Sequence, residues 1–340
     1  MKLYGAIDLH STNNVTVLID EEDKIVYEKR LPNDLTLILK ELSVYQWRVE
    51  GTVVESTYNW YWLVDGLMAE GYKMHLANTA AIQQYEGLKY TDDHSDARWL
   101  AHLLRLGVLP EGYIYPRADR PVRDLLRKRS QLVRQRTINL LSIQNLLTRN
   151  TGESLSANRV KGLDVQQVDE LLPDGDLALA VKANLSVMCS ADEQREILER
   201  TITERVQLRP QFSFLKTVPG IGQILALTIM LETGDIGRFA SVGNFASYCR
   251  CVGSQKISNG KKKGQGNTKN GNKYLAWAFV EAAHFAIRFN SKIKSFYQRK
   301  KDKTKVIVAI KAVAHKLCRA CYYIMRDRVA FDVTRAFGQN

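Results

Sequence analysis

Residues 3–31, LYGAIDLHSTNNVTVLIDEEDKIVYEKRL, decide the fold of the N-terminal part of the chain. Short runs rich in Val, Ile, Leu and Tyr predict three strands, and the polar residues 21–23 form a turn between the second and third. The expected strands are 3–8, 14–20 and 24–31, and after them come a helix at 34–45, an apolar run at 52–54, a helix at 58–70 and a strand at 72–77. This order predicts a mixed α/β sheet with helices packed on it.

Three strands followed by a βαβ unit is also the order of the ribonuclease-H-like fold, which on pattern alone is one choice among several. A helix is expected from Asp93 to about Leu106. Long helical patterns at 121–147 and from 191 to about 208 predict an antiparallel helical arm, with a broken, acidic segment at 151–185 between them. A new helical domain begins near Arg209. We therefore expect domains at 1–115, 116–208 and 209–340.

The charge of the chain is concentrated. All 340 residues carry a net charge of +13, and residues 250–305 contain 15 Lys and Arg against 2 acidic residues, which is the same net charge. A concentrated basic patch is typical of proteins that bind a phosphate backbone. A second basic region spans 117–136. Two separate basic surfaces suit a long or branched nucleic acid, and the alternative for each is an ordinary solvated helix face.

Neither the cysteines nor the hydropathy suggest an exported or membrane protein. Five cysteines do not indicate a disulfide framework, and we interpret them as structural thiols rather than zinc ligands. The first ten residues have too short an apolar run for a signal peptide, and no run of about 18 apolar residues occurs. We expect a soluble cytoplasmic protein without a membrane partner.

Four acidic residues lie where strands end or a helix begins. Asp8 closes the first strand, Glu55 follows the apolar run at 52–54, and Asp93 and Asp96 stand three apart at the start of a helix. Neighbouring strand ends converge on one edge of a sheet, so these carboxylates are candidate ligands for a divalent metal ion. Each of them alone is more typical of a turn residue or a helix cap, and it is their joint placement in a basic protein that favours a metal site.

Two segments of the C-terminal part are candidates for contacts with phosphate. Residues 217–222, TVPGIG, resemble a helix-hairpin-helix turn, whose glycines let the backbone approach a phosphate; the alternative is a tight interhelical turn. Residues 251–273 predict a flexible, cationic loop that carries Ser254 and Ser258. Read from the residues alone, such a serine is more often a phosphate contact than a nucleophile. His284 and His315 are expected to be core or groove residues.

Five motifs in order resemble the DEDD transposases of the insertion sequence 110 family. The residues around Asp93 and after Cys251 are most similar to its insertion sequence 1111 subgroup. The five motifs are Ala6-Ile-Asp-Leu-His10, Val53-Val-Glu-Ser-Thr-Tyr58, Asp93-His-Ser-Asp-Ala97, Thr217-Val-Pro-Gly-Ile-Gly222 and Gly253-Ser-Gln-Lys-Ile-Ser-Asn-Gly260. The resemblance extends from about residue 3 to residue 333. It implies a RuvC-like α/β domain, a helical coiled-coil arm and a mostly α-helical transposase domain.

The resemblance also implies a chemistry. In such enzymes the tetrad Asp8, Glu55, Asp93 and Asp96 binds Mg²⁺, or Mn²⁺, and a serine that matches Ser258 attacks the DNA. This chain reads Ser-Asn-Gly where the family pattern has Ser-Gly, so Ser254 is the alternative. The implied partners are donor and target DNA, a structured bridge RNA and further copies of the chain, as a tetramer associated with the nucleoid. The basic residues expected to contact nucleic acid are Arg120, Arg123, Arg127, Lys128, Lys256, Lys261, Lys262, Lys263, Lys269 and Lys273.

Two other functions compete with a transposase. A metal-dependent junction nuclease needs only the tetrad and would give hydrolysis products without a protein-DNA adduct. A nonenzymatic nucleic-acid-binding scaffold would bind without regard to magnesium and cut no strand.

Overall fold

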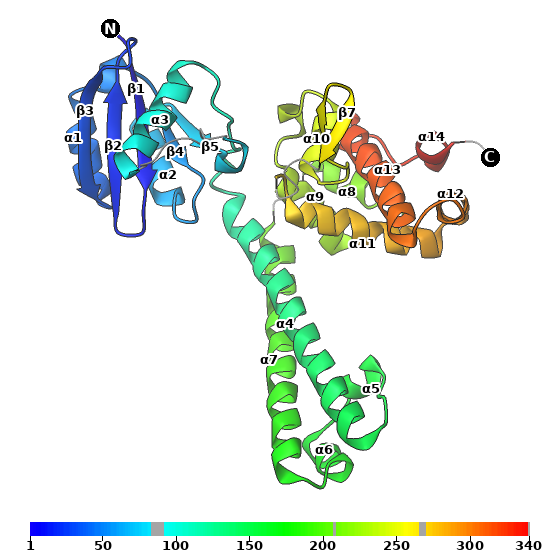
Figure 1. Cartoon of the computed structure of the whole chain (residues 1–340). Helices are drawn as coiled ribbons and strands as arrows, with labels where there is room; N and C mark the ends of the chain where they lie inside the picture. The colour runs from blue at the N-terminus through cyan, green and yellow to red at the C-terminus, as the bar shows by residue number, and fades with distance from the viewer. Residues whose placement is uncertain (83–91, 207–208, 265–269, 339–340) are drawn as a thin grey trace. The chain divides into compact units, whose positions relative to one another are not determined.

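The computed structural model describes residues 1–82, 92–206, 209–264 and 270–338 (Figure 1). The chain divides into two compact units, Met1–Arg117 and Ala118–Asn340. The first is a mixed α/β unit and the second is mostly helical, as the sequence predicts. None of the helices formed by the described residues combines the length and the apolar character needed to cross a bilayer.

One five-stranded sheet organises the N-terminal unit. Its strands are β1 (Leu3–Leu9), β2 (Asn13–Ile19), β3 (Ile25–Pro32), β4 (Val49–Glu55) and β5 (Met74–Ala77), in the spatial order β3-β2-β1-β4-β5. β2 pairs antiparallel with both β1 and β3, whereas β4 pairs parallel with both β1 and β5. The predicted meander and βαβ order are therefore confirmed, with strand ends shifted by at most three residues.

Helices cover the two faces of this sheet. They are α1 (Leu35–Ser43), α2 (Tyr61–Ala69) and α3 (Asp93–Arg105), with short 3₁₀ turns at Gln46–Arg48 and Thr79–Ala81. On β1, Ile7 packs in one apolar cluster with α1 and α2, and Ala6 packs in another with α3. Because side chains alternate along a strand, the even-numbered residues of β1 face α3.

Two long helices begin the second unit and pack along each other. They are α4 (Arg120–Thr151) and α7 (Gly175–Arg205), connected through α5 (Ala157–Lys161) and α6 (Val165–Leu171). α7 starts sixteen residues before the predicted helix at 191, so the prediction of a broken segment up to 185 is wrong. The break ends at Pro173, because Asp174 caps the new helix by accepting hydrogen bonds from Asp176 N and Leu177 N.

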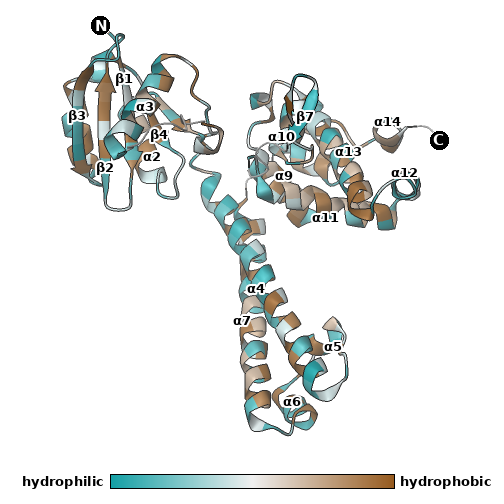
Figure 2. Cartoon of the chain, in the orientation of Figure 1, coloured by the Kyte–Doolittle hydropathy of each residue, from teal (hydrophilic) through white to brown (hydrophobic). Residues whose placement is uncertain are grey.

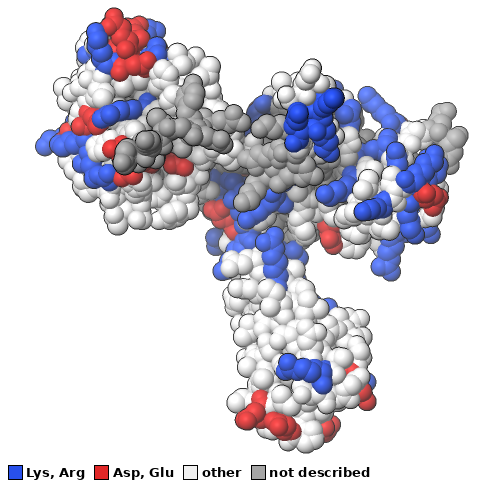
Figure 3. All heavy atoms as spheres, viewed as in Figure 1, with Lys and Arg blue, Asp and Glu red and all other residues white. Residues whose placement is uncertain are grey.

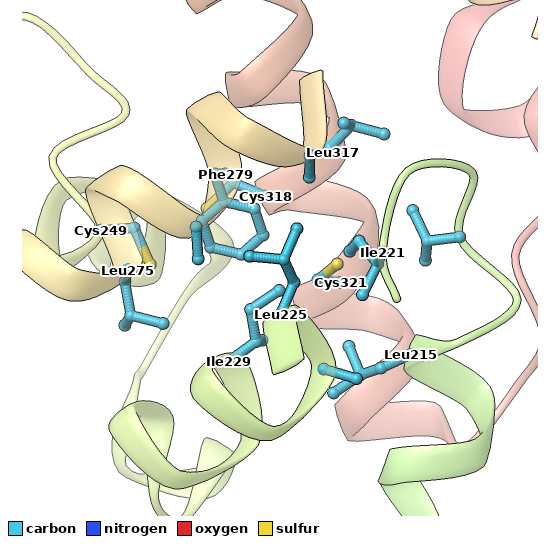
Figure 4. Packing of buried hydrophobic residues seen from close by; sticks show 14 of the residues in the cluster. Leu215, Ile221, Leu225, Ile229, Cys249, Leu275, Phe279, Leu317, Cys318 and Cys321 are labelled. Atoms are coloured by element: carbon cyan, nitrogen blue, oxygen red, sulfur yellow. The ribbon is translucent and has the colours of Figure 1, made fainter. Parts of the chain in front are cut away.

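A helical core completes the second unit. Its elements are α8 (Pro210–Leu215), α9 (Gln223–Thr233), a 3₁₀ turn (Ile236–Arg238), α10 (Val242–Tyr248), β6 (Lys256–Ser258), β7 (Lys261–Gly264), α11 (Lys273–Phe289), α12 (Ser291–Lys301), α13 (Val306–Asp327) and α14 (Val333–Phe337). Figure 4 shows Leu225 of α9, Phe279 of α11 and Leu317 of α13 meeting in this core. Hydrophobic residues run along α11 in Figure 2.

The cysteines contribute to packing. All five are free thiols, and Cys249, Cys318 and Cys321 are buried in the C-terminal core (Figure 4). Burial raises the pKa of each of these three thiols above the usual range. Such thiols behave as small hydrophobic side chains, in agreement with the structural role expected for them.

The turn before α9 is explained by packing. Gly220 has a φ of +85°, and a Cβ built on it would lie 2.3 Å from Ala282 O and 2.7 Å from Ala286 N of α11. A Cβ built on Gly222, the N-cap residue of α9, would have no atom within 4 Å. Gly220 is therefore required by the close approach of the turn to α11, whatever else the turn contacts.

We predict that Gly220→Ala lowers the free energy of unfolding of the C-terminal unit by about 2–3 kcal/mol, because the methyl group meets backbone atoms and the φ is left-handed. Chemical denaturation followed by circular dichroism measures this change. Gly222→Ala is the matched control and should cost less than about 1 kcal/mol. Equal losses in the two variants would contradict the packing explanation.

Candidate active site

Asp8 is a buried carboxyl group at the end of β1, only 5% exposed. As an even-numbered residue of β1 it lies on the face of the sheet that α3 covers. Glu55, the last residue of β4, is half-buried and alternates with Val54, which packs on the opposite face with α1 and α2. The parallel pairing of β1 and β4 thus brings both carboxyl groups to one edge and one face.

The first turn of α3 supplies the other two acids. Asp92 is the N-cap residue and accepts a hydrogen bond of 2.7 Å from Ser95 N. Asp93 and Asp96 follow in the first turn, where acidic side chains interact favourably with the helix dipole. The alternative reading of Asp93 as the cap is therefore wrong, and Asp92 is occupied by capping.

His10 and Arg30 contact this acidic group and were not singled out from the sequence. His10 Nε2 lies 3.3 Å from Asp8 Oδ2 and 3.2 Å from Asp93 Oδ2, and Arg30 donates to Asp93 Oδ2 at 2.6 Å. The side chains of Asp8, His10 and Asp93 each offer one possible metal-ligand atom, and these atoms all lie within 4.8 Å of one another. The available signal was a histidine two residues after a strand-end aspartate.

The other three predicted acids lie near enough to Asp8 to affect its pKa. Burial, together with the negative charges of Glu55, Asp93 and Asp96, raises the pKa of Asp8 to about 6, against the opposing effect of His10. Burial and the charge of Asp96 also raise the pKa of Glu55. The Arg30 hydrogen bond instead lowers the pKa of Asp93.

This group of side chains fits a divalent cation. Carboxylate oxygens of Asp8 and Asp93 lie close together beside His10, and the buried Asp8 ionises at a cost. Hard oxygen ligands are those that Mg²⁺ and Mn²⁺ prefer, and a cation among them would remove the mutual repulsion.

The predicted serine loop contains regular structure. Lys256–Ser258 and Lys261–Gly264 form a two-stranded antiparallel hairpin in which Ser258 pairs with Lys261. Asn259 and Gly260 have φ values of 49° and 69°, as in a tight turn that requires two positive φ angles. Residues 256–264 therefore form a hairpin that the sequence analysis did not predict; Asn259-Gly260 was the hairpin signal that we missed. Ser258 is exposed and Ser254 is half-buried.

The predicted basic contacts differ in exposure. Arg120 and Arg123 are buried, at 4% and 6% exposed, which argues against phosphate contacts by these two side chains. Lys128, Lys273 and the three lysines 261–263 are exposed. Lys and Arg gather over the hairpin and over α12 to α14 on the face that Figure 3 shows. The side chain of Lys256 and the whole of Lys269 lie outside the described residues.

Arg123 and Arg127 instead bind Glu232 of α9, which is 1% exposed. Arg127 makes two hydrogen bonds to the carboxylate, at 2.6 and 2.8 Å, and Arg123 Nε lies 3.2 Å from Oε2. Asn272 donates to the same Oε2 at 2.7 Å. Burial alone would raise the pKa of Glu232, but these partners lower it below its ordinary value. We call these four residues the Glu232 network.

The Glu232 network also reaches the end of the segment that carries the serines. The side chain of Asn272 caps α11 by accepting hydrogen bonds from Tyr274 N and Leu275 N. Its backbone N–H donates to Tyr248 O at 2.6 Å. Arg250 donates to Gly271 O at 2.8 Å. The chain before the hairpin is thereby tied to the chain after it.

Known proteins match two parts of the chain. A family model described as "Transposase", of the DEDD type of IS110, matches residues 6–150, a range that contains all four acids. A second, "Transposase IS116/IS110/IS902 family", matches residues 213–298, which include the hairpin. The first match indicates a DEDD-type transposase domain in the N-terminal part of the chain. Over these two parts the chain is similar to transposases of the IS110/IS116/IS902 family.

Curated relatives agree with this family. "Insertion element IS110 uncharacterized 43.6 kDa protein" of Streptomyces coelicolor is 23% identical over 46% of this chain and 39% of its own length. "Putative transposase y4qE" of Sinorhizobium fredii is 25% identical over 66% of this chain and 55% of its own length. "Insertion element IS116 uncharacterized 44.8 kDa protein" of Streptomyces clavuligerus is 20% identical over 53% and 45%. The matches thus span about half the length of these relatives.

We predict that Asp8→Asn stabilises the metal-free protein at pH 8. The pKa of Asp8 is raised in the folded state from 3.8 to about 6, so stability is lost as pH rises through this interval. Removing the charge should restore about 3 kcal/mol at pH 8 and almost nothing at pH 3.5. Denaturation of both proteins in a chelator measures the difference. Added Mg²⁺ should stabilise the parent more than the variant, and a variant less stable at pH 8 would contradict the prediction.

A second prediction concerns the Glu232 network. Asn272→Ser keeps a capping hydroxyl but is too short to reach Glu232, so it should cost about 2 kcal/mol of stability through the lost charged hydrogen bond. The matched control is Asn290→Ser, since Asn290 caps α12 in the same way at a half-buried position. That control should cost only a few tenths of a kcal/mol. Urea denaturation compares them, and similar losses would refute the role of the network.

Proposed function

We propose that this protein cuts and rejoins DNA strands as the transposase of an insertion sequence. The observation that supports this most is that Glu55, Asp93 and Asp96 lie near enough to the buried Asp8 to raise its pKa, in a chain that is similar to transposases over residues 6–150 and 213–298. A nonenzymatic scaffold would have no need for a buried carboxyl group that ionises at such a cost.

The four acids are the proposed ligands of Mg²⁺, or of Mn²⁺, and His10 is close enough to two of them to assist. When bound, a divalent ion supplies positive charge to the phosphodiester oxygens that become more negative during cleavage. The protein's own contribution is to hold the carboxylates together before DNA arrives. Asp8 is fixed by β1 and Asp93 by its contacts with His10 and Arg30.

We propose Ser258 as the nucleophile. Its Oγ forms a bond to a backbone phosphorus and the bond from that phosphorus to one DNA oxygen breaks; the hydroxyl proton passes to solvent and the leaving oxygen gains one. A DNA hydroxyl later attacks the phosphoserine, which restores the serine and rejoins a strand. A covalent intermediate retains the phosphodiester for rejoining, whereas hydrolysis by a nuclease discards it. The hairpin presents Ser258 in an exposed position beside Lys261, whose charge favours a phosphate.

The partners in this proposal are donor and target DNA and a structured bridge RNA. The exposed lysines 261–263, Lys128 and Lys273 are the proposed phosphate contacts. The active form would be a tetramer at the nucleoid, in which the acidic site of one copy meets the serine of another. We further propose a RuvC-like domain at 1–115, a coiled-coil arm at 116–208 and a transposase domain at 209–340.

We predict that Ser258→Ala folds and binds DNA and RNA but forms no denaturation-resistant protein-DNA adduct, because it removes only the attacking oxygen. Incubation with DNA from an insertion-sequence end, flanking RNA and Mg²⁺, followed by a denaturing gel, detects the adduct. Ser254→Ala is the matched control and should retain it. Asp8→Ala, or a chelator, should abolish cleavage while binding persists. Cleavage by Ser258→Ala with products of hydrolysis would instead favour the junction nuclease.

A further inference from the structure

A cavity of about 470 Å³ lies at the C-terminal end of the chain, lined by neither the acids nor the hairpin described above. One wall is a single face of α13, to which Lys316, Arg319 and Tyr323 contribute at helical spacing. The facing wall is the segment that returns from α13 into α14, with Phe331 and Arg335. Alanine and aliphatic side chains complete the lining.

Hydrogen bonds hold the second wall in place. The Asp332 carboxylate caps α14, and Lys316 Nζ donates to Ala336 O at 2.8 Å. Phe331 N donates to Thr217 Oγ1 at 2.8 Å, which connects this wall to the turn before α9. The cavity is therefore built by the fold itself, as ligand sites usually are.

Positive charge predominates in the cavity. Lys316, Arg319 and Arg335 face a single acid, Asp332, whose carboxylate accepts the capping hydrogen bonds of α14. Burial lowers the pKa of His315 and of Lys316, and the charge of Arg319 lowers both further. Cations that repel one another in this way favour an anion in the cavity.

The rest of the lining suits a flat, unsaturated ring. Tyr323 and Phe331 are half-buried at the cavity, and the aliphatic residues would exclude water from the ring edges. Aromatic platforms beside arginines are the way proteins bind the unstacked bases of single strands. The volume lies within the range of sites for molecules of nucleotide size.

We propose that this cavity binds one unpaired nucleotide, with Arg319 and Arg335 at its phosphate and Tyr323 beneath its base. The proposal rests on the proposed function in so far as that function brings DNA or RNA to the protein. It adds a position where the protein contacts the base itself and not only the phosphate backbone. The lysines of the hairpin, by contrast, offer charge alone.

The experiment compares single strands with and without bases. Fluorescence anisotropy measures binding of the full-length protein to a thymidine oligomer and to an abasic oligomer with the same number of phosphates. We expect about tenfold tighter binding of the thymidine oligomer. Tyr323→Ala should bring the ratio close to one, Tyr323→Phe should preserve it, and the exposed Tyr58→Ala is the control. A uridine oligomer shows whether DNA or RNA is preferred.

Charge is tested by Arg335→Gln, which should weaken binding of both oligomers about equally and reduce the salt dependence by about one counterion. Arg159→Gln, an exposed arginine of α5, is the matched control. If folded Tyr323→Ala keeps the same ratio of affinities for the two oligomers, the cavity proposal is overturned while DNA binding by the protein is not. Equal displacement of both oligomers by polyglutamate would have the same meaning. A parent protein that binds neither oligomer would overturn the proposed function as well.

Discussion

The burial of one carboxyl group beside three other acids is the constraint on which the N-terminal unit depends. Asp8 is almost fully buried, and this burial, together with the charges of Glu55, Asp93 and Asp96, raises its pKa to about 6. Such an arrangement is costly for folding and persists only where the surrounding structure enforces it. Here the sheet enforces it through the parallel pairing of β1 with β4 and the packing of α3 on one face.

In the C-terminal unit the charge of a buried carboxylate is stabilised by neighbouring side chains. Glu232 is even less exposed than Asp8, but two arginines and Asn272 bind it and lower its pKa. Its charge is compensated inside the protein, so it contributes to the joining of α4, α9 and α11 and not to ligand binding. At the acidic site His10 compensates the charge of Asp8 only in part, since the pKa of Asp8 stays raised, and this is the physical reason to assign a cation to the one site and not to the other.

The basic residues also differ in whether their charges are paired inside the protein or exposed on its surface. Arg123 and Arg127 lie in a strongly basic stretch of sequence, yet their charges are used by Glu232. Exposed cations are instead found on the hairpin and around the cavity beside α13, and the two differ in chemistry. The hairpin offers a hydroxyl among lysines, whereas the cavity offers aromatic and aliphatic surface with arginines. Backbone contact and base contact can thus be separate tasks in one unit.

The sequence by itself indicated the strands along the chain, a mixed α/β unit followed by a mostly helical one, and four acids as candidates for the site. These signals are local, because alternation along a strand and turn residues at its ends act over a few neighbours. It also contained the Asn259-Gly260 turn and the Asp174 cap, which we did not use. Only the tertiary structure decided that His10 and Arg30 meet the acids, that Arg123 is buried, and that Gly220 is needed for packing. Each of these depends on contact between residues distant along the chain, and neither charge nor spacing reveals which partner a side chain will meet.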